Sequence, residues 1–159
     1  MFNYVSKDYK CPICLGIKGI ENDDTMLKKP DLIYHNKLTS VFVNSFFITG
    51  NEGHLIVVPN EHFENIYDLP EEYTNAIMET SRRMSILVKQ AYPCDGITLR
   101  QNNGPAAGQH AFHFHLHIHP RYDNDKFNEE IARKRATTLE ERLKYINKLK
   151  AQRIISTLI

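Results

Sequence analysis

Five of the eight histidines lie in one short segment, HAFHFHLHIHP at residues 110–120, and the last four of them each follow an apolar residue. Neutral imidazole is both a nucleophile and a metal ligand, so this segment could carry out nucleophilic transfer or bind a metal ion. Alternate side chains of a strand share one face, so the pattern predicts a strand with an apolar side in the core and an exposed row of imidazoles. That row consists of His113, His115, His117 and His119. A solvent-facing strand with no chemical role is the alternative interpretation.

Protonation of one ring in such a row disfavours protonation of the next, so most of these histidines should be neutral near pH 7. The preceding loop, NNGPAAGQ at 102–109, could form an anion-binding concavity from its backbone amides, or it could be only a tight turn between two strands. A nucleophile, a neighbouring acid and an oxyanion cradle are together what phosphoryl or nucleotidyl transfer through a covalent phosphohistidine requires.

A second cluster begins at Cys11-Pro-Ile-Cys14, whose two-residue spacing lets both thiolates reach one tetrahedral Zn²⁺. No second CxxC follows, because Cys94 stands alone, so the other two ligands would have to be histidines. A redox pair and a chance pair of reduced cysteines are the alternatives, although no thioredoxin-like βαβ pattern surrounds the motif.

The composition narrows the class of protein. The chain has 159 residues, enough for one domain with its own core, and its 20 Lys+Arg against 19 Asp+Glu give a net charge of +1. That balance offers no general attraction to nucleic acid or to an anionic membrane. Three cysteines make no disulfide framework, the first ten residues resemble no signal peptide, and the longest apolar runs are far too short to span a membrane. We therefore expect a cytoplasmic protein with no nucleic-acid or membrane partner.

Five short strands and two helices would position these residues. Runs rich in β-branched and aromatic residues predict strands at 31–35, 40–44, 54–59, 96–101 and 112–120. A long one-sided helix is predicted over 68–92, with Asp68 as its N-cap and Pro70 in its first turn, and an apolar stripe predicts a second helix from about Thr137. This order of elements indicates an α+β fold with a mainly antiparallel sheet.

HFHLHI at 113–118, preceded by NNGPAAGQ and followed by PRY, resembles the signature of the histidine triad (HIT) family. GHLIVVPNEH at 53–62 resembles the family's Gly-His strand that ends in Pro, and VFVN at 41–44 resembles its ribose-contacting strand. The resemblance implies the HIT-like α+β fold, which has an antiparallel sheet of about five strands, one long helix and a C-terminal helix. It also implies a homodimer. We expect a single HIT domain over 1–159, with its core at about 11–122 and a C-terminal helical extension at about 126–155.

The resemblance also assigns roles to the histidines. The middle histidine of the triad, here His115, would attack the α-phosphate of a nucleotide to give a nucleotidyl-histidine that water then cleaves. The third, His117, would orient the phosphate or help to protonate the leaving group. Related uridylyltransferases carry Gln at this third position, so a histidine there favours a hydrolase. Substrate contacts would come from Asn44 at the ribose, from Asn102 and the backbone around Gly108 and Gln109 at the phosphate, and from His54 near the nucleotide.

The N-terminal CxxC is similar to that of a zinc-containing, bacterial-type branch of the family. The ligands implied here are Cys11, Cys14, His62 and His113. Such a closed set would hold a structural Zn²⁺, and no organic cofactor is implied. Two positions depart from the family pattern. His119 replaces an apolar residue, and His110 stands where many relatives have a Ser or Thr that touches phosphate, a contact that an imidazole N–H could replace.

The leading hypothesis is a nucleotide-binding hydrolase or phosphoramidase that cleaves at the α-phosphate of a nucleoside 5′-phosphate derivative through His115. Its ligand would be a nucleotide such as AMP or a dinucleoside polyphosphate. One alternative is a dinucleoside polyphosphate hydrolase or phosphorylase, and another is a nucleotide- or zinc-binding regulatory module with little turnover. A third is an enzyme with a catalytic metal on the histidine row itself.

Overall fold

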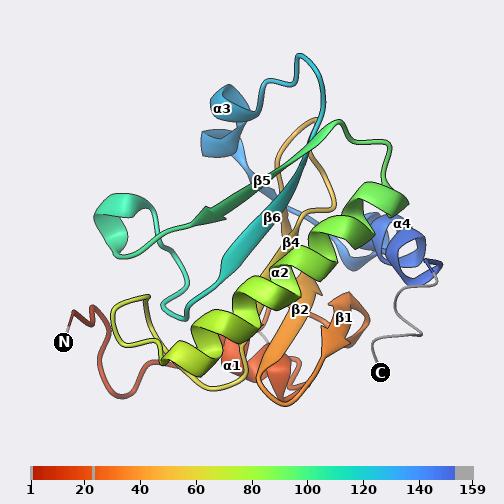
Figure 1. The fold of residues 1–159 in the computed structure, drawn as a ribbon. Helices are drawn as coiled ribbons and strands as arrows, with labels where there is room; N and C mark the ends of the chain where they lie inside the picture. Colours follow the sequence, from red (N-terminus) through yellow and green to blue (C-terminus); the bar gives the residue numbers. More distant parts are fainter. Residues whose placement is uncertain (1, 23, 153–159) are drawn as a thin grey trace.

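A five-stranded antiparallel sheet forms the centre of the computed structural model, which describes residues 2–22 and 24–152 (Figure 1). The strands lie in the order β1-β2-β4-β6-β5. Their bounds are β1 Leu32–His35, β2 Thr39–Val43, β4 Leu55–Pro59, β5 Gly96–Gln101 and β6 Leu116–Arg121. A separate two-stranded sheet pairs β3 (Phe46–Phe47) with β7 (Arg135–Ala136).

One face of the central sheet is covered by two packed helices (Figure 1). α2 (Glu71–Ala91) crosses this face and contacts β2, β4, β5 and β6, while α4 (Leu139–Lys150) packs against α2, β1 and β2. The shorter helices are α1 (Pro12–Ile17) and α3 (Phe127–Glu130), and the 3₁₀ turns are η1 (Lys29–Asp31), η2 (Pro105–Ala107) and η3 (Ile131–Arg133). The predicted α+β fold with one long helix and a C-terminal helix is confirmed. None of the helices in the described part of the chain has the length and apolarity needed to cross a membrane.

Both faces of the sheet are buried near its centre, which explains why the middle strands are continuous apolar runs. In β4, Leu55 and Val57 belong to the core under α2. Ile56 and Val58 of the same strand belong to a second cluster with Ile13 of α1, on the opposite face. The N-terminal segment therefore packs across the sheet from α2.

β6 shows the same alternation as β4. Leu116 and Ile118 pack in the core under α2. His117 and His119 therefore project from the opposite face, where the N-terminal segment packs. The chemistry-bearing side chains and the main core lie on different sides of one sheet.

The predicted strands match the structure closely for the first four, each of which begins and ends within one residue of its predicted bounds. The long helix α2 begins later than predicted, because its N-cap is Pro70 and not Asp68. The carbonyl of Pro70 accepts the N–H groups of Tyr73 and Thr74, both at 3.0 Å, which starts the first turn there. The prediction of Asp68 as N-cap is therefore wrong.

The C-terminal helix α4 starts with a capping box. The hydroxyl of Thr138 accepts the N–H of Glu141, and the Glu141 carboxylate accepts the N–H of Thr138. Ile146 and Leu149 join the core under α2, so this helix is fixed by packing as well as by its cap. Of the predicted extension to residue 155, residues 153–155 lie outside the described residues.

The fifth strand is shorter than predicted, and its histidines do not form an exposed row. β6 begins three residues after His113, so His113 and His115 precede the strand. The N–H of Phe114 donates to the carbonyl of Phe63 at 2.6 Å, which ties this segment to another part of the chain. The His113, His115 and His119 side chains are 0%, 8% and 3% exposed. The prediction of a solvent-facing row is wrong, because loops and α3 cover this side of the sheet.

Candidate functional site

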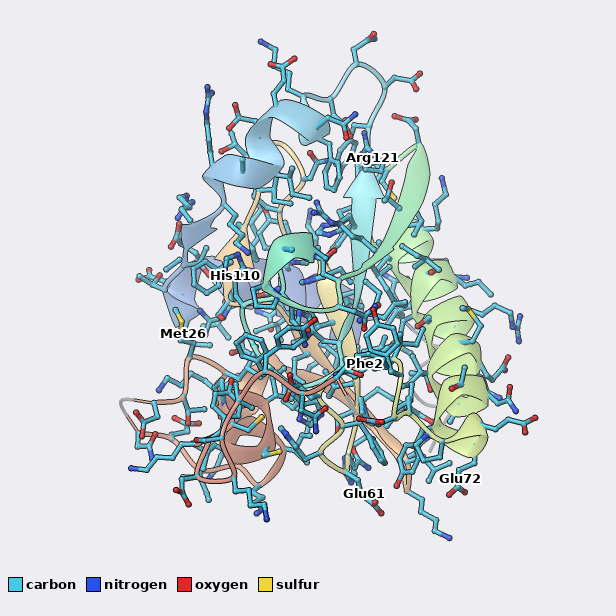
Figure 2. All side chains as sticks on the ribbon, turned by 90° about the vertical axis from the view of Figure 1, so that its left-hand side faces the viewer. Phe2, Met26, Glu61, Glu72, His110 and Arg121 are labelled. Atoms are coloured by element: carbon cyan, nitrogen blue, oxygen red, sulfur yellow. The ribbon has the colours of Figure 1, made fainter. Side chains whose placement is uncertain are left out.

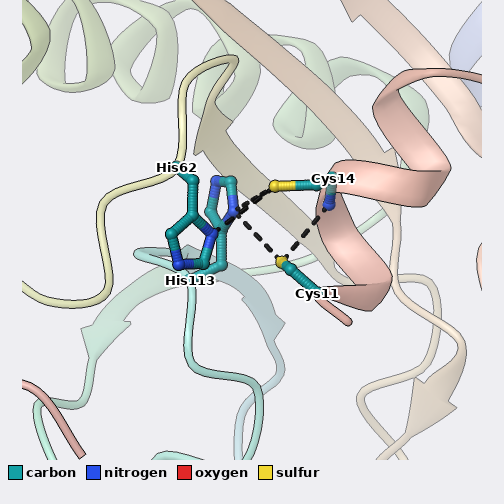
Figure 3. A group of neighbouring side chains, drawn as sticks. All are labelled: Cys11, Cys14, His62 and His113. Carbon is teal, nitrogen blue, oxygen red and sulfur yellow. Dashed lines mark hydrogen bonds between the residues drawn. The ribbon is translucent and has the colours of Figure 1, made fainter. Parts of the chain in front are cut away.

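Four predicted metal ligands meet at the start of α1 (Figure 3). Cys11 is the N-cap of α1 and Cys14 lies in its first turn, while His62 follows β4 and His113 precedes β6. The Sγ of Cys14 lies 3.5 Å from Nδ1 of His62 and 3.4 Å from Nδ1 of His113. The Sγ of Cys11 lies 3.4 Å from the same His113 nitrogen. The structure therefore brings together all four residues, which we call the Cys/His cluster.

The distances in the Cys/His cluster fit a tetrahedral zinc site. With Zn–S near 2.3 Å and Zn–N near 2.0–2.1 Å, the sulfur-to-nitrogen edge of a tetrahedron is about 3.6 Å long. The three observed sulfur-to-nitrogen distances are 3.4, 3.4 and 3.5 Å. Two thiolates and two imidazoles also form one of the usual ligand sets of structural zinc sites. The residues present could therefore hold Zn²⁺.

Hydrogen bonds orient the donors of the Cys/His cluster. The N–H of Cys14 donates to the Sγ of Cys11 at 3.4 Å. The Nε2–H of His113 donates to the carbonyl of Pro59 at 3.0 Å, which leaves Nδ1 unprotonated and facing the sulfurs. Hydrogen bonding from Cys11, and then from His113 and His62, lowers the pKa of the Cys14 thiol against the opposing effect of burial. The lowered pKa favours the thiolate form of Cys14, which is the form that binds a metal ion.

The two remaining histidines of the triad lie together. The rings of His115 and His117 are T-shaped, with centroids 4.9 Å apart. Nδ1 of His115 lies 2.7 Å from the carbonyl oxygen of His113. A carbonyl oxygen only accepts hydrogen bonds, so Nδ1 carries the proton and Nε2 keeps its lone pair. This arrangement gives His115 the form of a neutral nucleophile.

Burial keeps these imidazoles neutral. Desolvation lowers the pKa of His115 to about 4, although the hydrogen bond with the His113 carbonyl raises it. Desolvation also holds the pKa of His54 and His117 well below the ordinary value and lowers that of His119 to about 3. Repulsion between rings, the cause expected from the sequence, is the second contribution in His54 and His117. The neutral state of these rings therefore depends mainly on their burial beneath the loops and α3, and only secondarily on one another.

Two adjoining cavities share His110 and His117. His110 lies on the side of the molecule away from α2 (Figure 2). The first, of about 140 Å³, contains His115 and Asn44 among mainly apolar side chains. The second, of about 230 Å³, contains Arg100, His54 and His119. The residues that line both cavities are Asn102, Gly108, His110, His117 and Lys134.

The Gly-bounded loop reaches the cavities through Asn102 and Gly108. The Asn102 side-chain N–H donates to the carbonyl of Gly108 at 3.3 Å. Gly108 has φ of 81°, a left-handed conformation that favours glycine. The N–H groups of Gly108 and Gln109 donate to the carbonyls of Pro105 and Gly104 within the loop, at 2.9 and 3.1 Å. Neither amide is therefore a spare donor for an anion.

Gln109 lies beneath the loop and lines neither cavity. Its Nε2–H donates to the carbonyl of Glu64 at 2.6 Å, and its Oε1 accepts the N–H of Gly104 at 2.7 Å. The side chain is buried. The Gln109 side chain therefore holds the loop in place from below, whereas Asn102 and the exposed His110 line both cavities.

Asn44 and His54, both predicted to contact the nucleotide, are placed at different cavities. The N–H of Asn44 donates to the carbonyl of His54 at 3.0 Å, so the two residues are neighbours. The Asn44 side chain lies in the first cavity with His115, whereas His54 lies in the second with His119. Asn44 follows β2 directly and His54 precedes β4 directly.

Two basic residues of the second cavity were missed in the sequence. Arg100 pairs with His117 in the β5–β6 register, so their side chains share a face. Alternation within GITLRQ places Arg100 with Thr98 and could have identified it. Lys134 precedes β7, and burial and then Arg100 lower its pKa. No pattern signals Lys134, because its position depends on the pairing of β7 with β3.

Comparison with known proteins gives concordant results. The model of the HIT domain family matches residues 27–124. An uncharacterized HIT-like protein of Saccharolobus solfataricus is 38% identical over 94 residues, which cover 59% of this chain and 66% of that protein. A bis(5'-adenosyl)-triphosphatase of Dictyostelium discoideum is 28% identical over 115 residues, 69% of this chain and 76% of that protein. The fold is similar to the crystal structure of a Zn-bound histidine triad family protein from Mycobacterium smegmatis, with a TM-score of 0.73, 23% identity, and coverage of 94% of this chain and 95% of that one.

Proposed function

The chain belongs to the HIT family, and we propose that it is a nucleotide hydrolase or phosphoramidase that cleaves at the α-phosphorus of a nucleoside 5′-phosphate derivative through a nucleotidyl-histidine on His115. The observation that carries this proposal is the hydrogen bond between Nδ1 of His115 and the carbonyl of His113, which leaves Nε2 as a neutral nucleophile at a cavity. The similarity to a bis(5'-adenosyl)-triphosphatase supports hydrolysis.

The reaction would proceed in two displacements at phosphorus. In the first, the Nε2 lone pair of His115 forms a P–N bond while the bond to the leaving group breaks and the leaving group takes a proton from His117. In the second, water attacks phosphorus, the P–N bond breaks, its electrons return to Nε2, and the proton of the water returns to His117. A bound phosphate anion raises the pKa of a nearby imidazole, so His117 can carry the extra proton once substrate is present.

The two cavities would divide the substrate between them. The apolar walls of the first suit a base, and Asn44 at its edge suits a ribose hydroxyl. The second cavity carries Arg100, and Lys134 lines both cavities; in the described part of the chain neither forms an ion pair with a carboxylate. Two such cations favour an anionic leaving group over an uncharged amine. This arrangement supports nucleotide anhydrides as the better substrates, with phosphoramidates as slower ones.

Hydrolysis of diadenosine triphosphate and of an adenosine phosphoramidate by the purified protein tests this proposal. We expect AMP from both substrates, and a covalent adenylate that mass spectrometry detects after rapid quenching of the wild type and not of His115→Ala. His35→Ala is the control, because it removes a histidine from β1, at the opposite edge of the sheet from β5. AMP formation by His115→Ala at the wild-type rate would exclude the proposed mechanism.

Two related functions make different predictions in the same assay. A dinucleoside polyphosphate phosphorylase would need inorganic phosphate as the acceptor, whereas a hydrolase would not. A regulatory module with little turnover would bind AMP without forming the adenylate. The wild type would then release no AMP from either substrate although it bound the product.

We also propose that the Cys/His cluster binds a structural Zn²⁺. The sulfur-to-nitrogen distances and the unprotonated Nδ1 of His113 support it, and a similar fold from Mycobacterium smegmatis is Zn-bound. When bound, the ion would join α1, the segment after β4 and the segment before β6. With four protein ligands it would have no open position for substrate, so the chemistry would be left to His115.

A homodimer through β5 is part of the same proposal. β5 is an edge strand of the central sheet, and Leu99 on it is exposed beside the exposed Met78 and Ile86 of α2. An unpaired edge next to apolar side chains suits a second copy of the chain. Light scattering should give twice the monomer mass, and Leu99→Lys should reduce it to the monomer mass.

We further propose that the chain acts in the cytoplasm as one HIT domain with α4 as its C-terminal extension.

A further inference from the structure

Three histidines form a second buried cluster beside the reaction cavities. His117 and His119 alternate on β6, and His54 directly precedes β4. The β4–β6 register pairs Leu55 with Ile118, so His54 lies opposite His119. The ring centroids are 4.3 Å apart for His54 and His119, 5.4 Å for His54 and His117, and 5.3 Å for His117 and His119. We call His54, His117 and His119 the imidazole trio.

Most ring nitrogens of the imidazole trio have no hydrogen-bond partner in the described part of the chain. Both nitrogens of His54 and the Nδ1 atoms of His117 and His119 are buried without one. His54 is 2% exposed. A neutral imidazole has one N–H to donate and one lone pair to share, so burying either without a partner costs free energy. Packing alone does not explain why the fold places three such rings together.

We propose that the imidazole trio binds a divalent transition-metal ion such as Zn²⁺, at a site distinct from the Cys/His cluster. One donor nitrogen from each ring lies within 4.8 Å of the others. Zn–N bonds near 2.0–2.1 Å require nitrogens about 3.4 Å apart, a difference that rotation of the side chains can close. His117 and His119 project from one face of β6, and His54 directly precedes the neighbouring strand β4, so the three side chains gather on one face of the sheet.

The donor set selects the kind of metal. Three neutral nitrogens suit Zn²⁺, Cu²⁺ or Ni²⁺, whereas Mg²⁺ and Ca²⁺ prefer carboxylate and carbonyl oxygens. All three rings line the cavity of about 230 Å³, which leaves room for a fourth ligand. Arg100 and Lys134 line the same cavity and would repel a bare cation. We therefore expect an anionic fourth ligand, hydroxide or phosphate, that compensates their charge.

The state of the rings suits metal binding near neutral pH. Desolvation lowers the pKa of all three residues, so a metal ion would meet lone pairs and would not have to displace protons. Phe127 of α3 packs edge-on against His119, with ring centroids 4.9 Å apart, and limits the positions that this ring can take. His119 contributes the third ligand, and it plays no part in the proposed reaction.

A metal on the trio has a consequence for catalysis that rests on the proposed function. The ion would occupy His117, which the reaction needs as a proton donor, and would lie in the cavity that takes the leaving group. We therefore expect the metal to inhibit hydrolysis. His115 is outside the trio, so nucleotide binding in the first cavity should persist.

Titration of the protein, purified with its own zinc, with Co²⁺ tests the site. A site with three imidazoles gives only weak visible bands, whereas cobalt in the Cys/His cluster would add intense sulfur-to-cobalt charge transfer. We expect one additional Co²⁺ per chain with the imidazole spectrum. His119→Leu should weaken this binding by at least roughly 100-fold, because it removes one of three ligands. His35→Leu is the matched control, since it replaces a histidine of β1 in the same way and should leave binding unchanged.

The outcomes separate this proposal from the proposed function, because Co²⁺ stoichiometry does not depend on turnover. Absence of an additional Co²⁺ in the wild type, or equal binding in His119→Leu, would overturn the site. If His119→Leu fails to fold, anomalous scattering from wild-type crystals soaked in Co²⁺ decides. A peak among the three rings supports the site, and its absence there contradicts it. Where the protein proves to be a hydrolase, Zn²⁺ should inhibit the wild type at lower concentration than His119→Leu.

Discussion

The Cys/His cluster and the imidazole trio both take histidines from residues 113–119, yet the surrounding structure treats them differently. In the first, Nε2 of His113 donates to the Pro59 carbonyl and its Nδ1 faces two sulfurs. In the trio, neither nitrogen of His54 has a partner in the described part of the chain. The first has two thiols and two imidazoles, and the second has imidazoles alone. One group is complete as a four-ligand site, and the other has an open side toward a cavity.

The difference indicates how one histidine-rich segment serves two purposes. A closed site that joins residues 11–14, 62 and 113 would link parts of the chain that are far apart in the sequence, so its contribution would be to stability. An open site beside His117 lies in the cavity that would take the leaving group, so its contribution would be to reactivity and its control. In the sequence His115 lies between the two groups, and His113, two residues before it, provides a side chain of the Cys/His cluster and the carbonyl that accepts the Nδ1–H of His115.

His115→Ala should give the largest effect and should affect activity alone. Removal of a covalent nucleophile commonly lowers kcat by a factor on the order of 10⁴ to 10⁶. We expect a loss of that order in AMP release, with the zinc content unchanged. Steady-state kinetics and metal analysis of the same preparation measure both. A loss of zinc together with activity would mean that the two regions are not separable.

Cys14→Ser should have a large effect on stability and only an indirect effect on activity, which is the opposite of what we expect for His115→Ala. Loss of the zinc link should cost roughly 3 kcal/mol of unfolding free energy, which for a chain of this size lowers Tm by about 6–12 °C. Thermal unfolding and zinc content measure the effect. Cys94→Ala is the matched control, because it removes the one thiol outside the cluster and should keep the zinc. If Cys14→Ser unfolds at the wild-type temperature, the cluster is not a structural centre.

The contrast between the two regions could be predicted only in part. The apolar runs located the first four strands, and the CxxC spacing with the family resemblance placed all four members of the Cys/His cluster together. Alternation alone put His113 and His119 in one exposed row, because it carries no information on what covers a strand. That cover comes from loops and α3, which depend on tertiary packing. Lys134 was missed for the same reason, since the β3–β7 pairing that positions it joins two segments of only two residues each.

Asp125 lies just before α3, whose Phe127 packs against His119, and substitution of Asp125 should have an intermediate effect. Its carboxylate accepts hydrogen bonds from Arg121 at 2.7 and 2.8 Å, from Asn51 at 2.7 Å and from the N–H of Tyr122 at 2.9 Å. Asp125→Asn keeps the shape but removes the charge, and should cost roughly 2 kcal/mol because hydrogen bonds to charged groups are lost. Urea unfolding at pH 7 measures it.

The Asp125 carboxylate should also make the stability of the protein depend on pH. The hydrogen bonds with Arg121, and then those with the backbone and Asn51, hold the pKa of Asp125 well below its usual range. The unfolded chain therefore takes up a proton at higher pH than the native protein does. The stabilisation is complete above the unfolded pKa of about 3.9 and is lost as the pH falls toward the native pKa. We expect the stability difference between wild type and Asp125→Asn to narrow below pH 4, and a constant difference would contradict this assignment.

Arg100→Met and Lys134→Met should give the smallest effects. They test whether the cavity beside the imidazole trio favours an anionic leaving group. Arg100→Met removes a cation that lines the second cavity, and Lys134→Met removes one that lines both, so kcat/KM for a dinucleoside polyphosphate should fall about five- to tenfold while that for a phosphoramidate changes much less. Lys37→Met, at an exposed position between β1 and β2, is the control for loss of one positive charge. Equal losses on both substrates would instead place these cations at the α-phosphate, which the two substrates share. The open side of the trio would then face the reacting group, and a metal bound there would compete with the nucleotide itself and not only with its leaving group.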